Sequence, residues 1–133
     1  MEMWKEAFKG IIPTGDYQVN FINGEKQGLL IELENLSHKV SLYFGAVSAS
    51  RMIDEGVLLN GYLYNDNELN KYKPDRFANV IYEIESGEFG TFIHEQYGQL
   101  YEILNLKHYL IITMNYCIDI VSQWEPEITV LNK

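Results

Sequence analysis

The sequence predicts an α+β fold, built mainly from antiparallel β-sheet with one packed helix. Strand-rich blocks separated by turn residues fill the C-terminal quarter of the chain. These blocks are residues 109–113, 116–121 and 127–130. Apolar and polar side chains alternate at residues 39–44 and 79–85, as in half-buried strands, whereas residues 86–98 carry an apolar stripe at helical spacing. We expect the strands to form a curled sheet or a partly open barrel.

The N-terminal part of the chain predicts a short cover element and then a hairpin. Apolar residues at helical spacing within residues 4–12 predict a short N-terminal helix or an irregular lid, which Pro13 ends. Residues 17–22 and 29–33 are strand-like and flank an Asn-Gly dipeptide, which favours a hairpin turn. We therefore expect these two segments to pair as the first hairpin.

The middle of the chain predicts two more strands, a loop and the helix. The strand at residues 39–44 is followed by Gly45, which marks a bulge or bend, and by a continuing strand at residues 47–51. Residues 61–74 contain few aliphatic side chains and predict a surface excursion. Ser86 is the candidate N-cap of the helix that precedes the C-terminal strands.

The composition narrows the function to a small set of classes. The 133 residues are enough for one domain with one core. The net charge of -9 argues against nucleic acid and anionic membrane surfaces, and favours a basic protein partner. Neither a secretory signal nor a membrane-spanning apolar run is present in the sequence, so we expect a cytoplasmic protein. Cys117 is the single cysteine, and its apolar neighbours predict a buried, inert thiol.

The histidines do not form a recognisable metal motif. His38, His94 and His108 are scattered, and no two of them stand four residues apart as in a helical zinc site. We expect no metal and no cofactor. His94 and His108 remain candidates for a general base if a carboxylate orients one of them.

Two polar sites interrupt apolar segments. Arg51, Asp54 and Glu55 form a polar cluster at a predicted strand end, where they are either contact groups or solvated turn residues. Asp119 lies between two isoleucines in a predicted strand and needs a partner if it is buried. Its side chain shares a side with those of Cys117 and Val121, and we expect this side to be only partly covered. His108 and Arg51 are the candidate partners of the carboxylate.

Aromatic residues supply candidate anchors for a protein interface. Trp124 precedes a rigid proline turn, where core packing and recognition are both open. Tyr62, Tyr64 and Tyr72 lie in the predicted polar loop, so they are candidates for recognition or for a loop folded back on the protein.

Several segments resemble a set of small, mostly uncharacterised proteins of low-GC Gram-positive bacteria. The resemblance involves Phe44, Arg51, residues 54–56, the strand-to-helix passage at residues 82–89, and residues 108–111, 118–122 and 125–128. It covers much of the chain from Phe44 onward. The resemblance implies an antiparallel β-rich domain with one helix, no assigned enzymatic activity, and kinship with immunity proteins that neutralise polymorphic toxins.

The favoured hypothesis is a non-catalytic, acidic protein-binding domain, with a cognate bacterial toxin as the candidate partner. Carboxylates at Asp54, Glu55, Glu83 and Glu85 would pair with basic groups of the toxin, and exposed tyrosines would supply apolar contact area. Binding would then inhibit the toxin by occlusion.

The alternative is a small-molecule-binding protein or modest hydrolase. Its pocket would lie between the sheet and the helix, with Asp119 or His108 as the acid-base group. The predicted lining residues are Tyr82, Phe89, Phe92 and His94. This hypothesis fails if His94, His108 and Asp119 lie on separate surfaces with no shared cavity.

Overall fold

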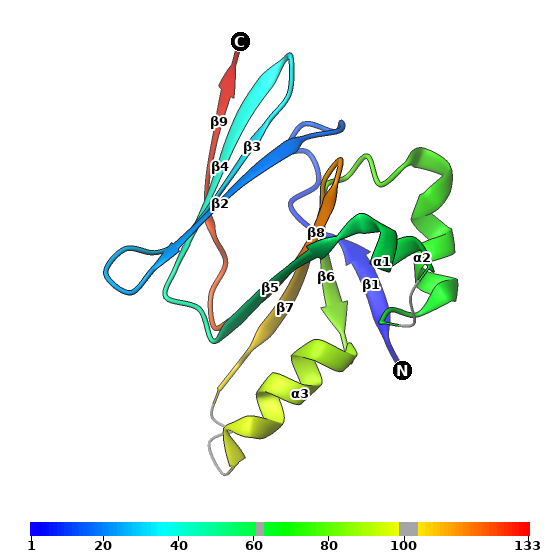
Figure 1. The fold of residues 1–133 in the computed structure, drawn as a ribbon, viewed down its shortest axis with the longest axis vertical. Coiled ribbons are helices and arrows are strands. Elements are labelled where there is room, and N and C mark those ends of the chain that lie inside the picture. The colour runs from blue at the N-terminus through cyan, green and yellow to red at the C-terminus, as the bar shows by residue number, and fades with distance from the viewer. Residues whose placement is uncertain (61–62, 99–103) are drawn as a thin grey trace.

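The structure, a computed structural model, describes residues 1–60, 63–98 and 104–133 and contains two antiparallel β-sheets (Figure 1). The five-stranded sheet has the order β1 (Met3–Glu6), β6 (Ile81–Glu85), β7 (Lys107–Ile112), β8 (Tyr116–Ser122) and β5 (Ala49–Asp54). The four-stranded sheet has the order β2 (Gln18–Gly24), β3 (Gly28–Glu34), β4 (His38–Gly45) and β9 (Glu127–Asn132). The predicted α+β class with mainly antiparallel sheet is confirmed, and both sheets are open.

The described residues also form helices on one side of the five-stranded sheet. They are α1 (Glu55–Asn60), α2 (Asp66–Tyr72), the 3₁₀ turn η1 (Lys73–Asp75) and α3 (Glu88–Gln96). Figure 1 shows α3 beside the ends of β6 and β7, and α1 and α2 near β1. None of these helices combines the length and the hydropathy needed to cross a bilayer.

The four-stranded sheet contains the predicted first hairpin, formed by β2 and β3. Gly28 has a φ of 77°, and a Cβ at this residue would lie 2.3 Å from the carbonyl carbon of Gly45. Only glycine fits such a close approach. Leu29 pairs with Gly45 whereas Leu30 pairs with Tyr43, so the ladder is irregular at this point. The bulge predicted at Gly45 is confirmed.

The C-terminal strands divide between the two sheets. β7 and β8 form the predicted hairpin, whereas β9 leaves it and pairs with β4. Trp124, in the segment between β8 and β9, fixes this segment to β4, because its indole N–H donates to the Phe44 carbonyl oxygen over 2.8 Å. The chain therefore ends in a different sheet from the hairpin that precedes it.

The main apolar core lies between the two sheets. Alternation along each strand turns one set of side chains into this space, where they are fully buried. The set includes Ile31, Leu33, Val40 and Leu42 from the four-stranded sheet and Tyr109, Ile111, Ile118 and Ile120 from the five-stranded sheet. Each fully buried side chain of this size contributes about 1.5–3 kcal/mol of transfer free energy. This core accounts for the predicted alternation in the strands.

A second apolar cluster lies between the five-stranded sheet and the helices. Trp4 of β1 is its central aromatic residue. The ring centres of Trp4 and Tyr64 lie 5.8 Å apart in an edge-on contact. Trp4 also stacks on Tyr72 at 6.4 Å. Leu58 of α1 and Leu69 of α2 pack into the same cluster. The helices thus cover the second face of the sheet.

The predicted N-terminal helix does not form, and an irregular cover is found only at residues 7–12, where Ala7 and Ile12 pack into the main core. Residues 3–6 form strand β1, which pairs with β6 at the edge of the five-stranded sheet. Pairing with β6 satisfies the backbone of this segment and buries Trp4, which outweighs the weak helical spacing of its apolar residues. Phe8 then adopts a φ of 53°, and Gly10 a φ of 86°, so a helix cannot continue through them.

The predicted surface excursion at residues 61–74 is also wrong over most of its described part. Asn65 caps α2 by accepting a hydrogen bond from the backbone N–H of Glu68 over 3.1 Å. Glu68 in turn accepts from the Trp4 backbone N–H over 2.8 Å, which fastens α2 to β1. An Asn followed three residues later by Glu is a helix-start pattern that the sequence contained. The fold therefore has more helix than the single one expected.

The helix predicted at residues 86–98 is confirmed as α3. Its cap differs from the prediction, because Gly87 occupies the N-cap position without a side-chain hydrogen bond and Ser86 adopts a φ of 58°. None of the residues of α3 is fully buried. The helix therefore lies on the protein surface beside the sheet.

Candidate functional site

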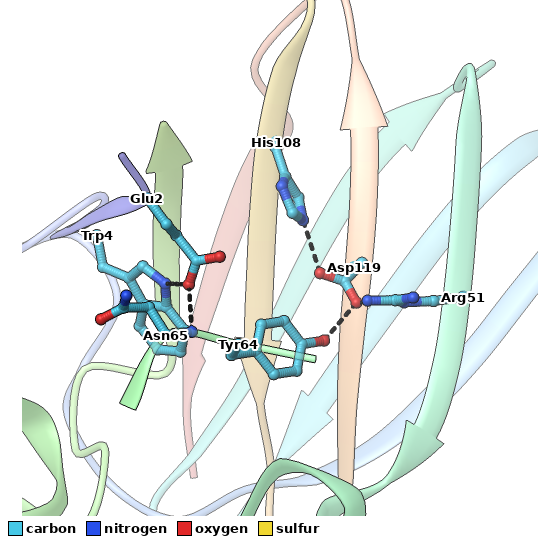
Figure 2. Close-up of polar contacts among 7 residues, drawn as sticks. All are labelled: Glu2, Trp4, Arg51, Tyr64, Asn65, His108 and Asp119. Atoms are coloured by element: carbon cyan, nitrogen blue, oxygen red, sulfur yellow. Dashed lines mark hydrogen bonds and ion pairs between the residues drawn. The ribbon is translucent and has the colours of Figure 1, made fainter. Parts of the chain in front are cut away.

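The helix-facing side of the five-stranded sheet holds a fully buried carboxylate, Asp119 of β8 (Figure 2). The Arg51 Nε atom lies 2.7 Å from its Oδ2 atom, and the Tyr64 hydroxyl donates to the same oxygen over 2.5 Å. The Nε2 atom of His108 lies 2.6 Å from Oδ1. We call these four residues the Asp119 cluster. It ties together β5, β7, β8 and the segment that precedes α2.

Strand register explains how two of these partners reach the carboxylate. Arg51 of β5 stands directly opposite Asp119 in the sheet. On β7, Leu110 is opposite Asp119, so His108 lies two residues along on the same face. The sequence indicated Arg51 and His108 as candidate partners, and the structure shows both in contact. The expected partial exposure of this side is wrong, because the Asp119 side chain is fully buried.

The hydrogen bonds keep Asp119 ionised. Burial acts to raise the pKa of this carboxyl, but the donors His108, Tyr64 and Arg51 outweigh it and hold the pKa below its usual value. An ionised carboxylate only accepts hydrogen bonds, so the Nε2 atom of His108 carries the shared proton. Burial and the Asp119 charge raise the pKa of Tyr64 above its usual range, which keeps the phenol protonated as a donor.

Arg51 extends the cluster toward α3. Its guanidinium lies 4.4 Å from the ring centre of Phe89, in a cation–π contact, and 5.9 Å from that of Tyr64. The His108 ring meets Phe89 edge-on at 6.0 Å. Phe89 therefore packs against two members of the cluster and holds the start of α3 over them.

A second carboxylate fastens the N-terminal strand beside the cluster. Glu2 accepts a hydrogen bond from the Trp4 indole N–H and another from the Asn65 backbone N–H, each over 2.8 Å (Figure 2). Asn65 directly follows Tyr64 in the chain. Glu2 therefore helps to position the segment from which the Tyr64 hydroxyl reaches Asp119.

A pocket of about 470 Å³ lies between α3 and strands β1, β6 and β7. His94 and His108 both line it. The Nε2 atom of His108 is in contact with the Asp119 carboxylate. The two histidines of the small-molecule hypothesis therefore share a cavity, whereas Asp119 does not line it and reaches it only through His108. The lining differs from the prediction, because Tyr82 is buried in the second apolar cluster, Phe92 is 56% exposed, and Phe89 covers Arg51.

His108 has one ring nitrogen without a hydrogen-bond partner. Among the described residues, the buried side-chain polar atoms that lack a partner are the hydroxyls of Tyr82 and Tyr109 and the Nδ1 atom of His108. Of these three residues, His108 lines the pocket. An unsatisfied buried polar atom costs about 1–3 kcal/mol, so this nitrogen needs an explanation.

Metal and thiol chemistry find little support in the described residues. No group of three or more His, Cys, Asp or Glu side chains in residues 1–60, 63–98 and 104–133 is arranged to hold a metal ion. Burial and the nearby Asp119 raise the pKa of the Cys117 thiol to about 12. Cys117 is fully buried, which agrees with the inert thiol that the sequence predicted.

A second candidate site is an exposed surface where the β7–β8 turn meets the end of β5. Asp54 stands opposite Tyr116, and the Glu55 backbone N–H donates to the Asn115 carbonyl over 3.0 Å. On the other side of the turn, a depression of about 580 Å³ is lined in part by Met114, Leu36 and Asp16. We call this the hairpin-end surface. It comprises Asp16, Leu36, Asp54, Glu55, Met114 and Tyr116.

The hairpin-end surface combines negative charge with apolar area. Leu36 is 96% exposed, Met114 46% and Tyr116 41%. Asp16 and Asp54 are exposed, and Glu55 is half-buried. These exposed apolar side chains and the carboxylates beside them offer contact area and negative charge together.

The other predicted binding residues are dispersed. Tyr72 packs on Trp4, Glu83 lies 3.5 Å from the Lys5 ammonium, and Glu85 is exposed at the edge of the pocket beside α3. Trp124 is 49% exposed and is held by its bond to Phe44. Tyr62 lies outside the described residues.

Five of the predicted residues fall into two groups, one internal and one exposed. Arg51, Tyr64 and Asp119 belong to the internal Asp119 cluster, whereas Asp54 and Glu55 lie on the hairpin-end surface. Sequence analysis missed Met114 and Tyr116 as surface residues. Their position in the turn of a strongly predicted hairpin was the available indication.

Comparison of the chain with protein-family models, with curated proteins and with solved structures gave no significant match. The functional argument therefore depends on the geometry of these two sites.

Proposed function

We propose that this protein is a non-catalytic binding domain that covers a basic surface of a partner protein through its hairpin-end surface. The observation that carries the proposal is the grouping of exposed Met114 and Tyr116 with the carboxylates Asp54 and Glu55 at one end of the five-stranded sheet. Apolar side chains supply contact area, and the carboxylates select a basic partner.

The overall charge supports the same class of partner. A net charge of -9 attracts cationic proteins and raises the rate of encounter at low ionic strength. A bacterial toxin that uses basic groups to hold its own substrate is the candidate partner, and the protein would act as its immunity protein. Occupation of those groups by Asp54 and Glu55 would inhibit the toxin without any catalytic step.

A charge reversal tests the proposal. The double variant Asp54→Lys, Glu55→Lys changes the net charge by four and reverses the sign of the hairpin-end surface. A matched control, Glu127→Lys with Glu25→Lys, makes the same net change at exposed residues of the four-stranded sheet and its hairpin turn. The immobilised wild-type protein and both variants are incubated with extract of the source cells, and the retained proteins are identified and purified.

We expect the wild type and the control to retain one basic protein, and the Asp54, Glu55 variant to bind it about 10–100-fold more weakly. Tyr116→Ala should weaken binding at unchanged net charge. Co-expression of the wild type should also relieve growth inhibition by the purified partner. Retention of no basic protein by the wild type, or equal binding by both charge variants, would contradict the proposal.

A further inference from the structure

The start of α3 presents backbone donors to the pocket described above. The first N–H groups of an α-helix have no acceptor inside the helix, and here Gly87 at the N-cap brings no side chain to accept them. Gly87 and Gly90 both line the pocket. Free N–H groups and the helix dipole together favour an anion at such a position.

His108 supplies an independent indication of a ligand. Its side chain is only 5% exposed, and its Nδ1 atom has no partner among the described residues. A Cβ at Gly87 would lie 3.0 Å from Nδ1, and one at Gly90 would lie 2.8 Å from it. The unpaired nitrogen therefore faces the first turn of α3. The two glycines let the His108 ring lie directly against the backbone of this turn.

We propose that this pocket binds the oxyanion of a small molecule, such as a phosphate or sulfate group. The anion would accept hydrogen bonds from the N–H groups of the first turn of α3 and from Nδ1 of protonated His108. Since Asp119 occupies Nε2, a second proton on the ring has to sit on Nδ1, on the side of α3. The volume of about 470 Å³ exceeds that of the oxyanion alone and is typical of a small-molecule site.

The charges around the imidazole link binding to proton uptake. Asp119 and Arg51 form an ion pair, so protonation of His108 adds one positive charge that a bound anion offsets. The pocket walls carry both signs of charge, since Lys5 neutralises Glu83 and Lys107 pairs with Glu125. Among the described residues, the other ionisable groups at the pocket and the cluster include His94, Glu85, Glu88, Tyr64 and Cys117.

The attachment of α3 allows the anion to enter. Nδ1 is covered by the first turn of α3, so this turn has to move outward when the anion binds. No residue of α3 is fully buried, and helices with few buried contacts open at low free-energy cost. The cation–π contact between Arg51 and Phe89 then guides the helix back over the cluster.

Sulfate is a suitable probe, because it does not titrate between pH 5 and 8. Calorimetric titration of the full chain is performed at pH 6 and pH 8, in two buffers of different ionisation enthalpy, with amide NMR to locate the site. We expect tighter binding at pH 6 than at pH 8, net proton uptake on binding at pH 8, and the largest amide shifts at residues 87–91. The absence of sulfate binding at pH 6, or shifts centred elsewhere, would overturn the proposal.

His108→Gln tests the role of Nδ1, because the glutamine amide can still donate to Asp119 but has no atom at the Nδ1 position. We expect about a tenfold or greater loss of sulfate affinity at pH 6 and no proton uptake. His38→Gln, which removes a half-buried histidine from the four-stranded sheet, is the matched control and should retain both. Equal sulfate binding by the His108 variant and the control contradicts the assignment.

A spectroscopic measurement on the wild type covers the case in which the His108 variant does not fold. Imidazole ¹⁵N spectra should show that sulfate adds a proton at Nδ1 of His108, and an unchanged Nδ1 resonance at saturating sulfate would refute the proposal. The proposed protein-binding function is separable, because the Asp54, Glu55 charge variant should bind sulfate like the wild type.

Discussion

The two faces of the five-stranded sheet are stabilised in different ways. The face toward the four-stranded sheet is covered by aliphatic side chains such as Ile111, Ile118 and Ile120, whose burial is favourable without directional contacts. The opposite face carries Asp119 and His108, and the buried carboxylate is tolerated there because its three donors are in place. Adjacent residues of β8 therefore have different sensitivities to substitution.

This difference separates stability from function. The apolar face tolerates substitutions of similar size, since it depends mainly on volume. The polar face contributes less net free energy for the area that it buries, but it fixes the position of the His108 ring beside the pocket. A polar arrangement of this kind is expected where a fold positions a group for a ligand.

The largest effect is expected on the polar face. Asp119→Ala leaves Arg51, His108 and Tyr64 without their shared acceptor, and should lower the free energy of unfolding by about 3–5 kcal/mol. Urea unfolding at pH 7 measures this change. A loss below about 1 kcal/mol would mean that the cluster does not form.

The neighbouring residue tests the apolar face. Ile118→Ala removes buried aliphatic atoms and leaves a cavity, which should lower the free energy of unfolding by about 2–5 kcal/mol. The same urea experiment, repeated with Ile118→Val, should give a loss of about 0.5–1.5 kcal/mol. If both variants unfold like the wild type, the space between the two sheets is not the main core.

A smaller effect is expected when one donor to Asp119 is removed. Tyr64→Phe keeps the ring against Trp4 but deletes the hydroxyl, and should lower the free energy of unfolding by about 1–3 kcal/mol. Tyr43→Phe is the matched control, because its hydroxyl bond to the Gln27 carbonyl is exposed. The control should change stability by less than about 0.5 kcal/mol. Equal effects of the two variants would contradict the buried role of Tyr64.

The pH dependence of stability sharpens the comparison. The pKa of Asp119 is lower in the folded protein than in the unfolded chain, so its ionised form stabilises the fold above the usual aspartate pKa of about 3.9. This contribution is lost as the pH falls through the folded pKa. The stability difference between the wild type and Asp119→Asn should therefore shrink in acid, whereas the difference for Ile118→Ala should not. Urea unfolding from pH 7 to pH 3 tests both expectations.

The sequence predicts the strands well because alternation directly reflects burial. The C-terminal hairpin and the bulge at Gly45 both appear in the structure where the pattern placed them. β1 was missed because its conformation depends on pairing with β6, which lies far along the chain. The start of α2 was missed because its cap pattern at Asn65 lies in a segment with few aliphatic side chains.

The internal site was predictable in part. An acid between two isoleucines required a partner, and Arg51 and His108 were the named candidates. The role of Tyr64 was not visible, because a tyrosine in a polar segment has the same sequence pattern whether it faces solvent or a buried carboxylate. The His108 Nδ1 atom, which faces α3, depends on backbone geometry at Gly87 and Gly90 that sequence does not encode locally.

The most direct test of the Asp119 cluster is the protonation of the His108 ring at pH 7, measured by long-range ¹H–¹⁵N correlation on the wild type and Asp119→Asn. We expect a slowly exchanging proton on Nε2 of the wild-type ring, shared with Asp119, and a large change at this resonance in the variant. An Nε2 atom without a proton, or one unaffected by Asp119→Asn, would show that the buried carboxylate does not orient the imidazole.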